Sequence, residues 1–200
     1  MGVFGKKRTH RRLPRPLRDM SSMAREHGRR AIRGKVNWPI ADSNLAWVQN
    51  RLNLDLIKLV KASHQKPVVV DWGCGKGIAI TELAEKIRQA QCFGFSKEFY
   101  EDWTGNNRVK FIHGVAEDFL RYFKNNSIDV AYSFFGLLHS SGNPRTVLRN
   151  VLQVISKLKV GGKLIMEKSR TLEPMLFEKL DAAKFEISCE GAAMVITRNA

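Results

Sequence analysis

The segment Asp-Trp-Gly-Cys-Gly-Lys-Gly, residues 71–77, holds the residue types best suited to binding a small ligand. It follows the apolar run Pro-Val-Val-Val and precedes an amphipathic stretch, so the pattern predicts a strand, a glycine-rich turn and a helix. Glycine has no Cβ atom, so the backbone at Gly73, Gly75 and Gly77 can turn tightly and approach a ligand closely. The first prediction is therefore a ligand-binding turn at the end of a strand.

The spacing of these glycines excludes two common nucleotide-binding loops. The phosphate-binding loop needs a Ser or Thr after its lysine, whereas Gly77 follows Lys76 here. The dinucleotide pattern Gly-x-Gly-x-x-Gly also differs from the Gly-x-Gly-x-Gly of this turn. Asp71, immediately before the turn, would repel a phosphate and attract an ammonium group. The sequence therefore favours a ligand that carries positive charge.

Strand and helix patterns alternate along the chain around this turn. Apolar runs predict five strands, at 67–72, 91–96, 108–114, 127–135 and 160–168. Helical spacing predicts one long helix before them, within 41–64 and capped by Asp42 or Ser43, and further helices at 78–89, 97–103, 116–123, 144–158 and 172–183. The last two runs, 184–190 and 192–198, predict a hairpin across Gly191. This alternation predicts an α/β fold with a mostly parallel sheet, which binds its ligand at the carboxyl ends of the strands.

The charge of the chain is concentrated at its beginning. The whole chain has 34 Lys and Arg against 19 Asp and Glu, a net charge of +15, and residues 1–36 alone account for +10 of it. Because this segment has few apolar residues and repels itself, we expect a flexible basic arm. Residues 37–200 are expected to form a single domain, with 37–63 as a leading helix or lid.

Cysteine usage and hydropathy limit the class of protein. Cys74, Cys92 and Cys189 are isolated, which predicts neither a disulfide framework nor a metal site and favours a reducing compartment. No apolar run is long enough for a membrane span. We therefore expect a cytoplasmic protein, or one of an organelle matrix if the basic arm is a transit segment. The oligomeric state stays open.

Five segments, in order and spacing, resemble class I S-adenosylmethionine-dependent methyltransferases over roughly residues 64–200. They are VVVDWGCGKG, FGFSKEF, HGVAEDF, SIDVAYSFFGLLH and VISKLKVGGKLIMEK. The resemblance implies a Rossmann-like, doubly wound, seven-stranded sheet with an antiparallel last strand. It also implies S-adenosylmethionine as the cofactor and methyl transfer as the reaction.

The resemblance assigns a set of residues to the cofactor: Asp71, Gly73, Cys74, Gly75, Gly77, Phe95, Ser96, Glu98, Val115, Ala116, Glu117 and Phe134. The chain departs from the family at two of these positions. Ser96 stands where the family usually has the acid that binds the ribose, so either Glu98 reaches the ribose or Ser96 makes a neutral hydrogen bond. Val115 stands where an Asp is frequent, so adenine contacts are expected from the Ala116 backbone and the Glu117 side chain.

The predicted loop after residue 133 is the candidate wall of the acceptor site. Phe134 and Phe135 are candidates to stack on a planar acceptor, although a pair of aromatic residues at a strand end also suits a core. His139 is placed to act as a base, or to hydrogen-bond within its own loop. Glu167 and Lys168 end the predicted strand near the same crevice, where one of them is expected to be a solvated rim residue.

Motifs that would identify the acceptor are absent from the sequence. The residues at 133–136 are Ser-Phe-Phe-Gly, which argues against the common exocyclic-amine base methyltransferases and against a cysteine nucleophile for pyrimidine C5. The Lys-Asp-Lys-Glu set of ribose methyltransferases is not cleanly met, because Asp129 lies too early and only Lys168 has a suitable position. The chemistry of the loop alone therefore leaves the acceptor open.

The basic arm favours RNA, structured or ribosomal, as acceptor and partner. Its candidate phosphate-binding residues are Lys6, Lys7, Arg8, Arg11, Arg12, Arg15, Arg18, Arg29, Arg30 and Arg33. Three alternatives remain: a small-molecule methyltransferase, a catalytically weak RNA- or ribosome-binding assembly protein on the same fold, and an arm that binds an acidic protein or an anionic surface instead.

Overall fold

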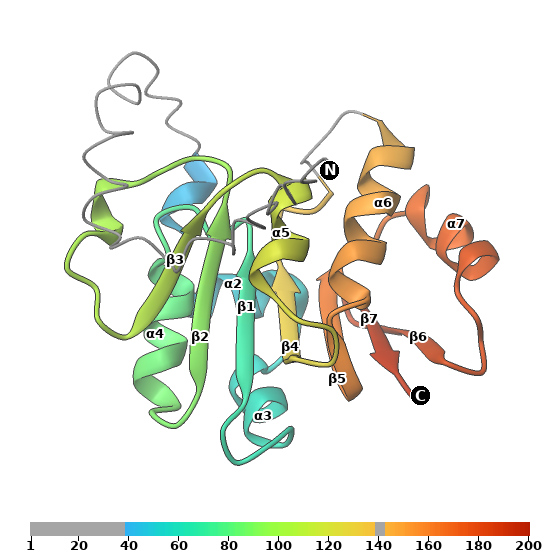
Figure 1. Cartoon of the computed structure of the whole chain (residues 1–200), viewed down its shortest axis with the longest axis horizontal. Coiled ribbons are helices and arrows are strands. Elements are labelled where there is room, and N and C mark those ends of the chain that lie inside the picture. The colour runs from blue at the N-terminus through green and yellow to red at the C-terminus, as the bar shows by residue number, and fades with distance from the viewer. Residues whose placement is uncertain (1–38, 139–142) are drawn as a thin grey trace, which may run out of the picture. The chain divides into compact units, whose positions relative to one another are not determined.

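The computed structural model describes residues 39–138 and 143–200, and within them seven strands form one sheet in the order β3-β2-β1-β4-β5-β7-β6 (Figure 1). The strands are β1 (Val68–Trp72), β2 (Gln91–Ser96), β3 (Val109–His113), β4 (Ile128–Ser133), β5 (Leu158–Glu167), β6 (Phe185–Glu190) and β7 (Ala193–Arg198). The pairs among β1 to β5 are parallel, and β7 is antiparallel to both β5 and β6. The predicted fold class, the antiparallel last strand and the terminal hairpin are thereby confirmed.

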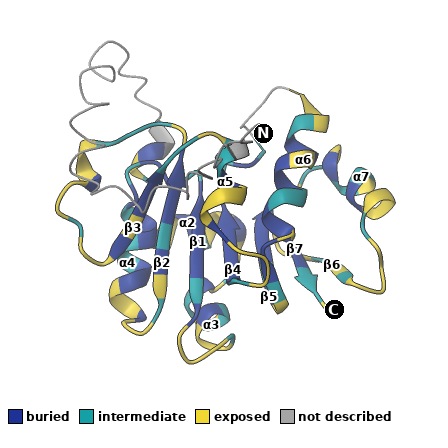
Figure 2. Cartoon of the chain, viewed as in Figure 1, coloured by how far each residue is buried: buried dark blue, intermediate teal, exposed yellow. Residues whose placement is uncertain are grey.

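Apolar side chains pack against both faces of the sheet. On one face lie α2 (Leu45–Leu52), α3 (Leu56–Lys61) and α4 (Ile78–Lys86), with Trp103 from the short η2 (Glu101–Trp103). On the other face lie α5 (Ala116–Tyr122), α6 (Pro144–Ile155) and α7 (Leu172–Lys179). Figure 2 shows the central strands buried along most of their length. Polar side chains therefore reach solvent mainly at the strand ends and on the outer sides of the helices.

The prediction of one long helix within 41–64 is wrong. The segment forms η1 (Pro39–Asp42), then α2, then α3. Asn53 ends α2 in the left-handed conformation, at φ 54°, and the Asp55 side chain caps α3 by accepting the N–H of Lys58 at 2.9 Å. Asn and Asp compete for backbone hydrogen bonds and so favour helix ends, which explains the break.

Two smaller helix predictions also differ from the structure. Asn44, rather than Asp42 or Ser43, caps α2 by accepting the N–H of Trp47 at 2.8 Å. The helix predicted for 97–103 is reduced to η2, a single 3-10 turn that begins at Glu101. None of the helices in the described parts of the chain is both long and apolar enough to cross a membrane.

The strand order reverses between β1 and β4. From β1 the chain proceeds outward to β2 and β3, then returns across β1 to β4 and β5. In open α/β sheets, the loops that diverge at such a point leave a crevice at the carboxyl ends of the strands. The glycine turn after Trp72 and the loop after Ser133 lie on the two sides of this crevice.

Candidate functional site

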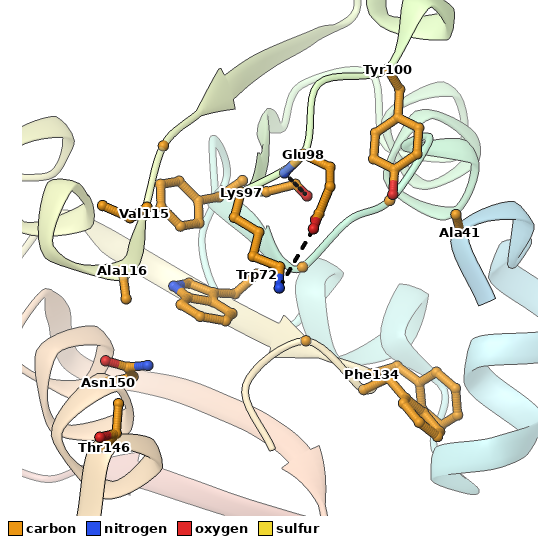
Figure 3. A pocket seen from close by; sticks show the side chains of 17 residues that line it. Ala41, Trp72, Lys97, Glu98, Tyr100, Val115, Ala116, Phe134, Thr146 and Asn150 are labelled. Carbon is orange, nitrogen blue, oxygen red and sulfur yellow. Dashed lines mark hydrogen bonds and ion pairs between the residues drawn. The ribbon is translucent and has the colours of Figure 1, made fainter. Parts of the chain in front are cut away.

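A cavity of about 520 Å³ lies at the carboxyl ends of β1 to β4, where the strand order reverses (Figure 3). This volume is within the range of about 300–1,000 Å³ that is usual for small-molecule sites. Its lining comes from η1, the ends of the four strands and one side of α6. The lining residues are Ala41, Trp72, Gly73, Gly75, Phe95, Ser96, Lys97, Glu98, Tyr100, Gly114, Val115, Ala116, Phe134, Phe135, Gly136, Thr146 and Asn150.

Two glycines bring the loops after β1 and β4 into backbone contact. Gly73 has φ 91°, and a Cβ atom added there would lie 2.4 Å from the Gly136 Cα. A Cβ atom at Gly136 would lie 2.2 Å from the carbonyl oxygen of Trp72. No side chain fits between these loops, so this part of the wall is built from closely packed backbone.

The segment η1 supports the glycine turn from the other side. The Lys76 N–H donates to the Ala41 carbonyl at 3.0 Å, and a Cβ atom at Gly75 would lie 2.7 Å from the Ala41 Cα. Lys76 also forms an ion pair of 2.6 Å with Asp42, and the indole N–H of Trp103 donates to the Gly75 carbonyl at 3.0 Å. The turn is therefore fixed before any ligand binds.

Asp71, predicted to attract an ammonium group, does not lie on the cavity wall. Its carboxyl is buried within β1, on the face of the sheet that carries Tyr132. Burial raises the pKa of Asp71 to about 7, and the neighbouring Tyr132 side chain partly opposes this rise. Cys74 and Gly77, two other predicted cofactor residues, are also not among the lining residues. The part of the turn that faces the cavity is Gly73 and Gly75.

The end of β2 brings a carboxylate over the cavity. Ser96 is buried, and its hydroxyl accepts the Glu98 N–H at 3.3 Å. The Glu98 carboxylate lies 3.5 Å from the Lys97 ammonium, and Figure 3 shows this pair extending over the cavity. The two candidates for the ribose contact were Glu98 and Ser96. Of these, Glu98 has its charged group directed over the cavity.

The end of β3 offers backbone and apolar surface. Gly114, Val115 and Ala116 line the cavity, and Val115 is 54% exposed. The Val115 N–H donates to the Asp118 carboxylate at 3.3 Å at the start of α5. Glu117 lies in α5, but its side chain is outside what the structure describes.

The loop after β4 joins the core and the cavity. Phe134 is buried, packs edge-on against Trp47 of α2 with ring centroids 4.7 Å apart, and also lines the cavity. Phe135 has φ 68°, and its N–H donates to the Glu167 carboxylate at 2.8 Å. Phe134 therefore packs in the core and also forms part of the cavity wall, so both of the alternatives considered for this aromatic pair apply to it. His139 lies outside the described residues.

Glu167, at the end of β5, is half-buried, whereas the neighbouring Lys168 is exposed. Burial raises the pKa of Glu167 above its ordinary value, and the Phe135 N–H and the charge of Arg51 act in the opposite direction. The described residues contain no cluster of His, Cys, Asp and Glu side chains that could hold a metal ion.

Several lining residues were not identified from the sequence. They are Ala41, Trp72, Lys97, Tyr100, Gly114, Gly136, Thr146 and Asn150. Trp72 packs in the core and also lines the cavity (Figure 3). Asn150 could have been identified from the sequence, because it is a polar residue at a helical spacing otherwise occupied by apolar residues. In the structure it is only 2% exposed.

Comparison with known proteins found a matching family model and many solved structures with the same fold. Residues 70–166 match the sequence model of a family described as a methyltransferase domain. No curated protein matches the chain in sequence. Many solved structures share its fold, and three of them illustrate the range of methyltransferases among these structures.

A Clostridium thermocellum protein assigned as an rRNA methylase is 18% identical, with a TM-score of 0.55 over 79% of this chain and 97% of its own. A Methanococcus maripaludis protein assigned as an S-adenosyl-L-methionine-dependent methyltransferase is 14% identical, with a TM-score of 0.52 over 81% of this chain and 90% of its own. The N-methyltransferase NodS of Bradyrhizobium japonicum WM9, in complex with S-adenosyl-L-homocysteine, is 13% identical, with a TM-score of 0.52 over 87% of this chain and 97% of its own.

Proposed function

Because this chain belongs to the class I S-adenosylmethionine-dependent methyltransferases, we propose that it methylates RNA, structured or ribosomal, which it engages through the basic residues 1–36. The observation that carries the acceptor is the charge asymmetry, since +10 of the net +15 lies in those residues. The likeness to an assigned rRNA methylase is one of fold, and the same fold occurs in NodS, so the fold alone does not choose an acceptor.

The cavity suits the cofactor's chemistry. Gly73 and Gly75 present backbone to the cavity, and this backbone is the proposed contact for the amino-acid portion. In this proposal Glu98 binds the ribose hydroxyls, and the adenine ring lies against Val115 and Ala116, which all line the cavity. When bound, the cofactor supplies a methyl group already activated by its sulfonium.

Holding the two reactants in line is then the main task of the protein. Positioning alone contributes about 7–11 kcal/mol to such reactions. The loop after β4 does this here, because Phe134 is fixed by Trp47 and the Phe135 backbone is fixed by Glu167.

The test of the RNA proposal is a salt titration of RNA affinity on the full chain. Replacing Arg11, Arg12, Arg15 and Arg18 by Gln is expected to lower both the affinity and the steepness of its salt dependence, because each neutralised phosphate contact releases counterions. The matched control replaces four exposed cations elsewhere, Lys61, Arg88, Lys179 and Lys184. Equal losses in both variants, or none in either, would contradict a specific role of the arm.

One alternative has specific support. Ser96 and Val115 stand where the family commonly has acids, which favours an RNA-binding assembly protein with little turnover. Calorimetry with S-adenosylmethionine separates the two functions. Binding in the micromolar range, together with transfer of labelled methyl to RNA, supports the enzyme, whereas no heat of binding at millimolar cofactor supports the assembly protein.

A further inference from the structure

Five side chains beside the cavity form a continuous set of contacts on the sheet face that carries α2. We call this set, Trp47, Arg51, Phe134, Phe135 and Glu167, the Glu167 cluster. The Arg51 guanidinium lies 5.8 Å from the centre of the Trp47 ring, and Trp47 packs on Phe134. The rings of Phe134 and Phe135 are 5.4 Å apart, and the Phe135 N–H binds Glu167. The charge of Arg51 also acts on Glu167, without a direct ion pair between them.

The direction of these side chains follows from strand alternation. Side chains two apart on a strand share a face of the sheet. Ile165 packs in the core beneath α2, and therefore Glu167 projects to that same face at the carboxyl end of β5. Phe134 belongs to the same core and lines the cavity. The cluster thus borders the cavity on its α2 side.

Only one of the two carboxylate oxygens of Glu167 accepts a hydrogen bond from the described residues. Its Oε2 atom accepts the Phe135 N–H at 2.8 Å, whereas among the described residues Oε1 makes no hydrogen bond or ion pair. A half-buried carboxylate that only supported the loop would gain from a second donor, because unpaired charge is costly away from water. Asp129 also accepts its hydrogen bonds through one oxygen only, Oδ2, but that oxygen has the Lys159 ammonium at 2.7 Å as a charged partner, which Glu167 lacks among the described residues.

We propose that the Glu167 cluster is the acceptor site and that it takes a planar nucleobase whose reacting nitrogen carries a hydrogen. The ring stacks on the aromatic surface of Trp47, which is 39% exposed, and of Phe135. Arg51 contacts the adjacent phosphate, and Glu167 Oε1 accepts the N–H. This inference rests on the proposed function, because it assumes RNA as the acceptor.

The reaction at this site balances without a further reagent. The nitrogen lone pair forms the new bond to the methyl carbon. The bond from that carbon to sulfur breaks and leaves its electron pair on sulfur. The nitrogen's hydrogen passes as a proton to Glu167 Oε1 and from there to solvent. Glu167 returns to its ionised form for the next cycle.

The test compares E167Q with wild type, because Gln can still accept the Phe135 N–H through its amide oxygen but cannot take a proton. On RNA we expect kcat/KM to fall about 10²–10³-fold and the acid limb of its pH profile to disappear. The affinity for S-adenosylhomocysteine should stay within about twofold, and the melting temperature should not change. Glu178→Gln, an exposed carboxylate elsewhere, is the matched control.

A binding measurement makes the inference independent of turnover. Adenosine, cytidine, guanosine and uridine 5′-monophosphates are titrated calorimetrically into the protein saturated with S-adenosylhomocysteine. At least one should bind wild type and lose tenfold or more in affinity with E167Q and with R51Q. Equal affinities in wild type and both variants, or no binding of any nucleotide to wild type, would overturn the acceptor site.

The two proposals fail separately. If E167Q methylates RNA as well as wild type while the arm variant loses RNA affinity, the acceptor site is wrong and the RNA proposal stands. If wild type transfers no methyl to any RNA, the proposed function is wrong.

Discussion

Buried carboxylates have different surroundings at the two ends of the parallel sheet. At the amino end, Asp129 of β4 is paired with Lys159 and the backbone of Val68, with His64 3.6 Å away. At the carboxyl end, burial raises the pKa of Asp71 to about 7, and Glu167 has no ion pair among the described residues. The same sheet thus has one end arranged for stability and one where charge is held at a cost. Perturbed carboxylates of this kind concentrate at functional sites.

The largest effect that would test this comparison concerns Asp71. Its folded-state pKa of about 7 lies above the ordinary pKa of 3.8 for an aspartate, so between these pH values the native state retains a proton that the unfolded state has lost. Wild type therefore loses stability as the pH rises through this window, by about 4 kcal/mol in total between pH 4 and pH 8. Asp71→Asn has no such titrating group and keeps a polar side chain of nearly the same shape beside Tyr132.

The measurement is the difference between the unfolding free energies of Asp71→Asn and wild type, from urea denaturation at a series of pH values. Taking the difference cancels the groups common to both proteins. We expect the variant to gain relative stability steadily up to about pH 7 and then to level off. Parallel curves at all pH values would mean that Asp71 is ionised without penalty, and the contrast between the ends would fail.

A somewhat smaller effect is expected at the opposite end. Asp129→Ala leaves the Val68 N–H without an acceptor and Lys159 without its partner, which should lower the free energy of unfolding by about 3 kcal/mol at pH 7. Affinity for S-adenosylhomocysteine should be unchanged, because Asp129 lies at the other end of β4 from the cavity. Asp129→Asn, which keeps an acceptor, should lose less. A loss of cofactor affinity in either variant would show that the two ends are coupled.

The smallest effect concerns Lys97. Its ammonium holds the Glu98 carboxylate over the cavity and repels a positively charged ligand. Because Lys97 is largely exposed, this pair is worth at most about 1 kcal/mol. Lys97→Met should therefore tighten S-adenosylmethionine binding about two- to fivefold in calorimetry at low salt, and the gain should shrink as salt is added. Weaker binding of the cofactor by this variant would assign Lys97 to ligand recognition instead.

Local patterns predicted most of the fold. Apolar runs and glycines gave the strands and the turn at 71–77 because these signals depend on neighbouring residues only. The prediction of a single leading helix failed at Asn53 and Asp55, whose side chains compete locally for backbone groups. The apolar residues keep their helical spacing across residues 53–55, but the backbone leaves the helical conformation there.

The site was harder to predict because its geometry depends on distant contacts. Asp71 is buried beside Tyr132, and Gly73 packs against Gly136, in each case a partner about sixty positions along the chain. Thr146 and Asn150 line the cavity because α6 follows the loop after β4 and packs beside α5, a tertiary arrangement that local sequence does not indicate. Glu98 was identified because the family usually has an acidic residue two positions earlier, at Ser96. Its ion pair with Lys97 could not be predicted from the sequence.

The backbone contact between Gly73 and Gly136 has a consequence for the thermodynamics of binding. Loops that must become ordered around a ligand lose conformational entropy at that moment, which weakens affinity. Here two of the loops that form the cavity are already held against each other, with no side chain between them. Their ordering occurs during folding, so the ligand meets a rigid wall, and binding should show little additional protection of these loops from hydrogen exchange.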